Sequence, residues 1–364
     1  MTPVSIPHPI AAPRAQGRLG RAAAWFFSSW SNSLGTLATL GLGGWLGWHL
    51  YLWAVRNAVF IGTAADCRAA RGACWAFIAT KLEFAVFGLY PLEERWRAVL
   101  ALALLAALVG ISLVRRFWSA RLVVAWAVII ALVYLVLAGG VLGLAPVPLR
   151  LWSGMVVTAW LSVVGLIAAY PLGLILALGR RSDMPVVRWF SIGWIEIVRG
   201  VPLVSILIMA SVVLPLFLPE GLEIANLMRA QVAFVLFGSA YLAEVFRGGL
   251  QAVPQGQYEG ATALGLGYWQ SLRLIVLPQA LKLVIPAQVN TFIAIFKDTS
   301  LILVIGVFDF LGTIKAMLSD PAWLGFSTEA YVFAAAVYFL MSWGMSRYSR
   351  HLERELNPER AGRS

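Results

Sequence analysis

The chain has 364 residues, 60% of them hydrophobic, and its mean hydropathy is +0.82. Charged residues make up 12%, about half the quarter that is usual in soluble proteins. These values exclude a disordered chain and favour an integral membrane protein over a soluble one. With 3 His and 2 Cys, the chain is not expected to hold a His/Cys metal cluster. No G-x-x-x-x-G-K-[ST] run occurs, so a P-loop is not expected either.

Long apolar runs predict an all-α integral membrane protein with about eight transmembrane helices. A flexible tail with a short interfacial stretch is expected before them, over 1–33. The first apolar run is long enough to span a bilayer, so we expect it to stay in the membrane rather than be cleaved as a signal peptide. Pro215 is expected to kink the fifth span. In chain order, the predicted spans are 34–55, 98–114, 122–144, 153–179, 201–219, 227–246, 284–308 and 329–346.

Lysine and arginine residues indicate how the chain is oriented. When both termini are placed in the cytoplasm, the inner segments carry about twice as many basic residues as the outer ones, as the positive-inside rule requires. The long segment 56–97 then lies outside. Cys67 and Cys74 lie in that segment and either form a disulfide or remain unpaired.

The segment between the sixth and seventh spans is too structured for a simple connection. Good helix formers and small residues predict one short helix over 255–264, ended by Gly265 and Gly267. A second helix is expected over 268–277, with Pro278 terminating it. Small residues on an exposed helix allow close docking, so this segment is expected to bind a cytoplasmic partner. The first helix is expected to expose Glu259, Ala261, Thr262 and Leu264.

Two motifs in this segment point to a known family. The first is Gln257, Tyr258, Glu259, Gly260, Ala261, Thr262, Ala263, Leu264 and Gly265, and the second is Ile275, Val276, Leu277 and Pro278. Together they resemble the EAA loop of ABC importer permeases. The sequence departs from the family at Gly260, where Ala is usual, and glycine costs a helix about 1 kcal/mol relative to alanine.

Three further stretches, 196–203, 240–249 and 297–301, resemble the polar amino-acid permeases of the histidine/glutamine type. The resemblance covers about 150–350. Three extra N-terminal spans and a long outer loop are similar to the larger permease subunit of general L-amino-acid transporters. The resemblance therefore implies a five-helix ABC importer permease core that follows three additional spans.

The resemblance also implies a domain organisation and a set of partners. The expected parts are a cytoplasmic tail over 1–33, three additional transmembrane helices over 34–149 with the periplasmic loop 56–97, the permease core over 150–350 with the coupling loop 247–282, and a cytoplasmic tail over 351–364. The expected partners are a second homologous permease subunit forming a heterodimer, two ABC ATPase subunits, a periplasmic amino-acid-binding protein, an amino-acid substrate and the bilayer, with no nucleic acid. ATP and Mg are expected on the partner ATPase, and no cofactor, metal or catalytic residue is expected in this chain. The location is the bacterial inner (plasma) membrane.

One motif of charged residues occurs twice at the inner membrane boundary. Glu196 and Arg199 are three residues apart, as are Glu244 and Arg247. This spacing places each pair on one helix face, where the charges can neutralise each other. Either these arginines extend to lipid headgroups while paired with glutamate, or they form a polar inner gate or a brace beneath the EAA loop. Tyr241 could donate a hydroxyl to substrate or serve only in helix packing.

Lys297, Asp298, Thr299 and Ser300 form a polar run inside the seventh span. The run starts 15 residues after Lys282, about 22 Å along a helix, which is near the bilayer centre. A charged side chain at that depth is energetically costly, so we treat it as a candidate functional residue. The run either faces a passage for zwitterionic substrate or makes a structural ion pair with a neighbouring span or subunit. Asp309, near the outer end, either caps or lines the exit or is a solvated end charge, and the solvated charge is the favoured expectation.

These patterns predict the permease subunit of an ATP-driven amino-acid importer, which forms the translocation path and couples to ATPase subunits through the EAA loop. The alternative is an ion-coupled secondary transporter that works without an ATPase. A membrane-embedded enzyme would need convergent nucleophile and base residues or metal ligands, and the sequence offers no such cluster.

Overall fold

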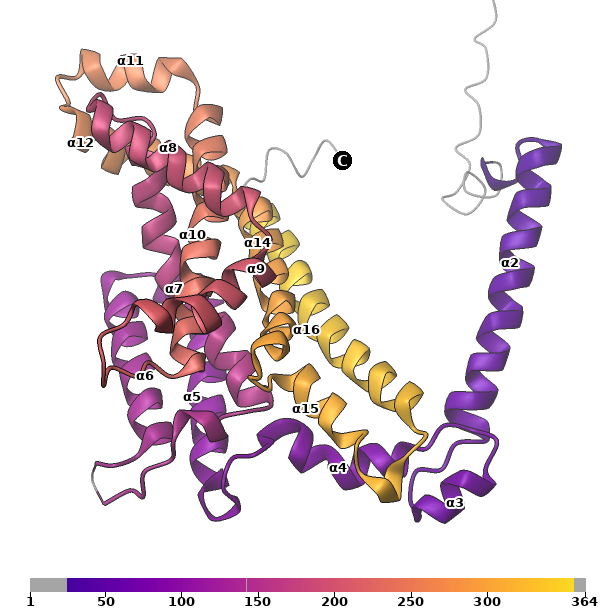
Figure 1. The fold of residues 1–364 in the computed structure, drawn as a ribbon. Helices are drawn as coiled ribbons and strands as arrows, with labels where there is room; N and C mark the ends of the chain where they lie inside the picture. The colour runs from indigo at the N-terminus through magenta and orange to yellow at the C-terminus, as the bar shows by residue number, and fades with distance from the viewer. Residues whose placement is uncertain (1–24, 142, 357–364) are drawn as a thin grey trace, which may run out of the picture. The chain divides into compact units, whose positions relative to one another are not determined.

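The computed structural model describes residues 25–141 and 143–356, and within them the secondary structure is helical, with two isolated β-bridges. The all-α fold is therefore confirmed (Figure 1). The chain divides into two compact units, which meet in sequence between Ala76 and Phe77. The predicted N-terminal tail lies outside the described residues up to 24, and the predicted C-terminal tail does so from 357.

The first unit contains α2 (Trp30–Tyr51), the π-helical turn η1 (Leu52–Arg56) and α3 (Ala64–Ala69). α2 begins a few residues before the predicted span and buries no residue within the unit. Thr63 and Asp66 cap α3 reciprocally, side chain to backbone. Cys67 and Cys74 form a disulfide with their Cα atoms 5.4 Å apart, which settles the alternative left open by the sequence.

The second unit, which begins two residues into α4, holds the remaining helices. Its helices up to the first bend are α4 (Trp75–Phe87), η2 (Leu92–Glu94), α5 (Arg95–Ser112), η3 (Arg115–Phe117), α6 (Ala120–Ala138), η4 (Leu149–Leu151), α7 (Met155–Gly179) and α8 (Pro185–Gly200). The rest are α9 (Leu203–Ile208), η5 (Met209–Val213), η6 (Leu214–Phe217), α10 (Asn226–Ala252), α11 (Gln255–Ala263), α12 (Tyr268–Ser271), η7 (Leu272–Val276), α13 (Leu277–Leu283), α14 (Ile285–Asp298), η8 (Thr299–Ile305), α15 (Phe310–Met317), η9 (Pro321–Trp323) and α16 (Ser327–Leu356).

Fewer helices qualify as membrane spans than the sequence predicts. Among the described residues, five are long and apolar enough, and a bent pair would make six. The five are Leu92–Ser112, Ala120–Ala138, Met155–Gly179, Asn226–Ala252 and Ile285–Ile305. α2 and α16 fall outside this group; α2 is rich in Gly, Ser and Trp, and α16 ends in charged residues that extend the helix through the start of the predicted tail. The count of about eight spans is thus not confirmed.

The end of one predicted span, one predicted connection and the shape of the next predicted span differ from, or add to, what the sequence indicates. The span predicted over 122–144 ends at Ala138, because Gly139 and Gly140 take positive φ angles of 66° and 79° that stop the helix. The segment 180–199 is largely the amphipathic helix α8 rather than a loop. A bend of 102° separates α8 from the helical segment that starts at Leu203, where Pro202 stands, and Pro215 lies in the 3₁₀ segment η6.

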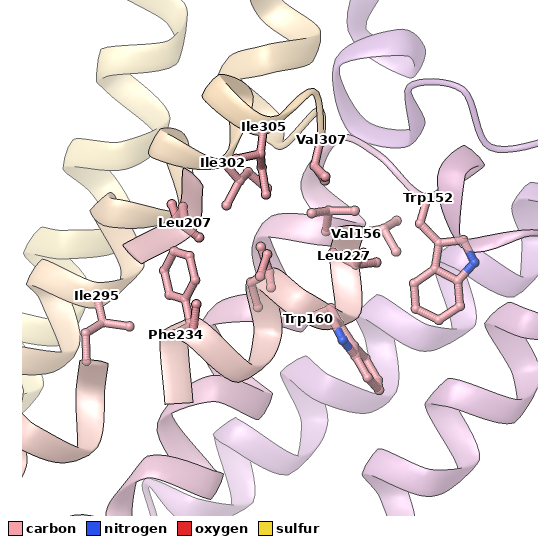
Figure 2. Packing of buried hydrophobic residues seen from close by; sticks show 14 of the residues in the cluster. Trp152, Val156, Trp160, Leu207, Leu227, Phe234, Ile295, Ile302, Ile305 and Val307 are labelled. Carbon is pink, nitrogen blue, oxygen red and sulfur yellow. The ribbon is translucent and has the colours of Figure 1, made fainter. Parts of the chain in front are cut away.

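The core of the second unit forms where α7 runs along α10. A Cβ atom added at Gly173 of α7 would lie 2.8 Å from Cβ of Leu242 and 2.9 Å from the carbonyl oxygen of Ser239, so the helices approach closely because this position lacks a side chain. Ala169, Ala177 and Ala243 pack in the small cluster that includes Leu242. A larger cluster of aromatic and aliphatic side chains from α7, α9, α10 and η8 forms another part of the core (Figure 2). They include Trp160 and Phe234.

Different helices lie near the two ends of α10. α11 and α12 lie at one end, whereas α4 and α15 lie at the other (Figure 1). There, the hydroxyl of Thr313 donates to the Ala85 carbonyl at 3.0 Å. Lys81 and Asp320 form an ion pair of 2.5 Å, whose hydrogen bond lowers the pKa of the Asp320 carboxyl. Asp309 caps α15 from a fully buried position and accepts from the Tyr338 hydroxyl at 2.9 Å. The favoured expectation of a solvated charge was therefore wrong, and the alternative of a capping residue agrees with the structure.

Candidate functional site

The predicted docking helix exists as α11. Pro254 starts it after α10, and Gly265, at a φ of +73°, ends the turn that follows it. Glu259 and Thr262 are exposed, and Leu264 is 77% exposed. Ala261 is only 1% exposed, so its predicted exposure was wrong. It shares a face with Tyr258, and that face turns towards the chain's own η7.

The remaining motif residues occupy the solvent side of α11. Gln257 and Gly260 are exposed, and the side chain of Gln257 accepts a hydrogen bond of 2.9 Å from Gln279 of α13. A Cβ at Gly260 would meet nothing within 4 Å. The departure from the usual alanine at this position therefore leaves the packing of α11 unchanged and bears only on its helix propensity.

Pro278 does not end the second helix of this segment, contrary to the prediction. The chain continues through α12, the π-helical turn η7 and α13 to Leu283. Pro278 is the second residue of α13, directly after η7. The π turn before it supplies the extra residue that allows the helix to pass the proline ring.

Apolar side chains gather at the exposed tip of this segment. Leu264, Tyr268, Trp269 and Leu274 are each more than 60% exposed. The opposite side of the segment packs on its own small core of Leu250, Val253, Leu272, Val276 and Ala280. Large apolar side chains exposed on a tip held from behind are typical of a docking surface.

The charged residues at the start of this segment form one cluster. Glu244 accepts from Arg180 at 2.7 Å and from Arg247 at 2.9 Å, and Arg199 lies 3.6 Å away. Glu196 pairs with Arg180 at 3.1 Å. We name these five residues the charge cluster. Of the two local pairs that the spacing predicts, Glu244–Arg247 forms, whereas Glu196 and Arg199 each pair across helices instead.

Arg180 is the member that the sequence reasoning missed. It follows α7 directly and reaches Glu244, which is 64 residues away in the chain. The only signal was its place among the basic residues of a predicted inner loop. The cluster brings three arginines onto two carboxylates, so Glu244, whose side chain is 16% exposed, is its centre. Tyr241 contributes a ring, with the Arg199 guanidinium 5.5 Å from its centroid.

The polar run of the seventh predicted span lies elsewhere on α14. Lys297 is exposed and Asp298 half-buried at the end of α14, and buried Thr299 starts the 3₁₀ segment η8. The Thr299 and Ser300 hydroxyls donate to carbonyls of the preceding turn at 2.8 Å. Within residues 25–141 and 143–356, neither Lys297 nor Asp298 makes an ion pair, so a structural pair would need another subunit.

The predicted site residues thus fall in three places. The motif residues from 257 to 265 form α11 and its end, Glu196, Arg199, Tyr241, Glu244 and Arg247 gather at the charge cluster, and Lys297 to Ser300 lie on α14 and η8. In the described part of the chain, no three His, Cys, Asp or Glu side chains could hold a metal ion together.

Comparison with known proteins identifies the fold and the family. Residues 169–357 match the model of the binding-protein-dependent transport system inner membrane component family. The chain belongs to this family. The match runs from the second half of α7 to the end of α16 and includes α11 and the charge cluster.

Individual relatives of this permease extend the match to the N-terminal helices. It is 49% identical over 376 residues, 99% of both chains, to the Escherichia coli K12 protein described as the inner membrane amino-acid ABC transporter permease protein YhdY. It is 39% identical to the Rhodobacter capsulatus glutamate/glutamine/aspartate/asparagine transport system permease protein BztC, over 88% of this chain and 89% of that one. A crystal structure described as an amino acid ABC transporter with histidines aligns with a TM-score of 0.51 and 31% identity, covering 56% of this chain and 92% of that chain.

Proposed function

We infer that this chain is the membrane-spanning permease subunit of an ATP-driven amino-acid importer, and that α11 couples it to a partner ATPase. The family match supports transport by an ABC-type complex. The observation that carries the coupling role is the tip of α11 and α12, where Leu264, Tyr268 and Trp269 are exposed beside Glu259. An apolar patch with one carboxylate suits a groove that carries a basic residue.

The rest of the proposed machine follows from the resemblance and the relatives. The chain pairs with a second homologous permease as a heterodimer, two ATPase subunits bind ATP and Mg, and a periplasmic binding protein delivers the amino acid. The core over 150–350 contributes five spans after three N-terminal ones, with both termini in the cytoplasm. Because the Rhodobacter relative is named for glutamate, glutamine, aspartate and asparagine, these four are the substrates to test first. The family match does not favour an ion-coupled transporter that lacks an ATPase.

The path residues are proposed on position and charge. Lys297 and Asp298 lie in a membrane-spanning helix without an ion-pair partner in the described chain, and a charge there is costly unless it faces protein or water. Thr299 and Ser300 extend this polar strip. The charge cluster with Tyr241 forms a polar gate at the α11 end of the core.

Charge reversal at Glu259 tests the coupling role. The complete complex, with companion permease, ATPase and binding protein, is reconstituted in proteoliposomes with the four amino acids as probes. Glu259→Lys should abolish ATP-driven uptake, because a cation would face the basic groove, while the protein still inserts. Uptake, substrate-stimulated ATP hydrolysis and co-purification of the ATPase are measured together.

Glu353→Lys is the matched control, because Glu353 is an exposed carboxylate on α16 outside the coupling segment. It should leave uptake unchanged. Normal uptake in Glu259→Lys would remove the docking role of α11. Uptake by the wild-type chain without any ATPase would instead restore the secondary transporter.

A further inference from the structure

Two adjacent arginines at the end of α7 reach in different directions. Arg180 extends to Glu244 of α10 at 2.7 Å and to Glu196 of α8 at 3.1 Å. Arg181 extends instead to the hydroxyl of Tyr258 on α11, at 3.1 Å. Neighbouring residues thus connect the docking helix and the charge cluster to one helix end.

Tyr258 is held on several sides. Its hydroxyl donates to the Leu250 carbonyl of α10 at 2.9 Å and accepts from Arg181. The Arg181 guanidinium also lies 5.6 Å from the centroid of the Tyr258 ring, a distance at which cation–π attraction operates. The ring itself packs against the small core beneath the docking segment. α11 therefore cannot shift at Tyr258 without moving the end of α10, the end of α7 or both.

Arg181 is linked to the charge cluster through its neighbour Arg180. Arg180 and Arg181 are joined by one peptide bond, and the Arg180 backbone N–H is bonded to the Leu176 carbonyl of α7. Among the five residues of the charge cluster, Arg180 alone forms ion pairs with both carboxylates, Glu244 on α10 and Glu196 on α8. Charge-assisted hydrogen bonds of this length resist stretching more than neutral ones. An unbroken series of side-chain contacts and one peptide bond thus joins α11 to α8 and α10.

We propose that Arg180 and Arg181 are positioning residues that transmit movement of α11 to the charge cluster, and so link nucleotide-driven motion to opening at the α8–α10 boundary. This inference rests on the proposed coupling role of α11. Arg180 belongs to the charge cluster, whereas Arg181 lies outside it and contacts α11, so the adjacent pair connects the two parts.

The test separates coupling from assembly. The reconstituted complex is measured for amino acid taken up per ATP hydrolysed, with Arg181→Gln, Tyr258→Phe and the double variant. Tyr258→Phe removes the hydroxyl, and with it the bonds to Arg181 and to the Leu250 carbonyl, and keeps the packed ring. Arg181→Gln removes the arginine contact while the Tyr258 hydroxyl keeps its bond to Leu250. Each single variant should lower uptake per ATP about tenfold, equivalent to about 1.4 kcal/mol, while ATP hydrolysis and co-purification of the ATPase persist. That is the size expected for one hydrogen bond to a charged group.

The double variant shows whether the two residues act through their shared contact. It should lose no more coupling than either single variant, because the same connection is already broken. Additive losses would overturn the proposal, as would an unchanged uptake per ATP in both single variants. If Arg181→Gln fails to assemble, Tyr258→Phe alone decides the question.

Two control variants test whether uptake per ATP falls for reasons other than loss of the contact between Arg181 and Tyr258. Arg188→Gln removes an exposed arginine of α8 that lies outside the cluster and should leave the ratio unchanged. Gln279→Ala frees α11 from α13 without touching α7, since Gln279 bonds to Gln257 at 2.9 Å. An equally large loss in Gln279→Ala would mean that any loosening of α11 uncouples transport, and would overturn the specific role of the arginines. Loss of ATPase binding in Glu259→Lys reports on docking separately, so the two proposals fail by different measurements.

Discussion

Glu244 shows how much a single side chain can organise at the end of a helix bundle. Its carboxylate meets arginines from the end of α7, from α8 and from its own helix at 2.7, 3.6 and 2.9 Å. With 16% of its side chain exposed, it is less accessible than any of them. Charges this close in a partly dry setting stabilise one another only as a set, because each needs the others to offset its lost hydration.

Replacing Glu244 with glutamine should therefore destabilise the protein and reduce transport. Three arginines would lose their shared counter-ion, and removal of one partner from a buried ion pair costs about 3–5 kcal/mol. The arginine side chains are 25–36% exposed, so solvent screening should reduce the cost to about 2 kcal/mol. The measurement is the midpoint of thermal unfolding in detergent, together with uptake. Glu223→Gln, at an exposed glutamate before α10, is the control; equal midpoints in the two variants would contradict the central role of Glu244.

Among the elements, α7 and α10 depend on a missing side chain. At Gly173 the approach of Leu242 and the Ser239 carbonyl leaves no room for a methyl group. Alanine would gain about 1 kcal/mol in helix propensity. It would also force apart two helices at a contact that includes backbone, and overpacking of this kind costs about 1–3 kcal/mol.

Gly173→Ala should thus be destabilising, whereas Gly344→Ala should be neutral or stabilising. A methyl group at Gly344 of α16 meets nothing within 4 Å, so only the propensity gain remains. Thermal unfolding of both variants in the same detergent makes the comparison. A midpoint for Gly173→Ala at or above the wild-type value would show that α7 and α10 can separate without loss.

Local signals in the sequence located the helices of the segment proposed to dock, and tertiary contacts decided their details. The helix over 255–263 and the glycine at 265 were predictable because helix formers and a residue with positive φ act within a few positions. The burial of Ala261 was not predictable, since it depends on which face meets η7. Arg180 was missed for a similar reason: its partner Glu244 is 64 positions away. The eight-span estimate treated glycine-rich and charge-ended helices as equal to the apolar ones.

At the scale of the whole molecule, the disulfide between Cys67 and Cys74 is a local device. Its two cysteines are seven positions apart, and closing so short a loop stabilises the folded state by about 2–3 kcal/mol in the chain-entropy model. Replacing both cysteines with serine should loosen the segment around α3 while ATP-driven uptake continues. Limited proteolysis of the double variant in proteoliposomes should show new cleavage near α3, and cleavage as slow as in the wild type would contradict this expectation.

The same cystine also bears on sidedness. Such bonds persist in oxidising compartments and are rare in the cytosol. Cys74 directly precedes α4, which lies at the end of the core opposite α11 (Figure 1). If the disulfide is found in living cells, α11 would therefore lie on the cytosolic, reducing side of the bilayer, where ATP is available to an ATPase subunit. Two sulfur atoms would thus give an independent check on orientation that does not depend on counting lysines and arginines.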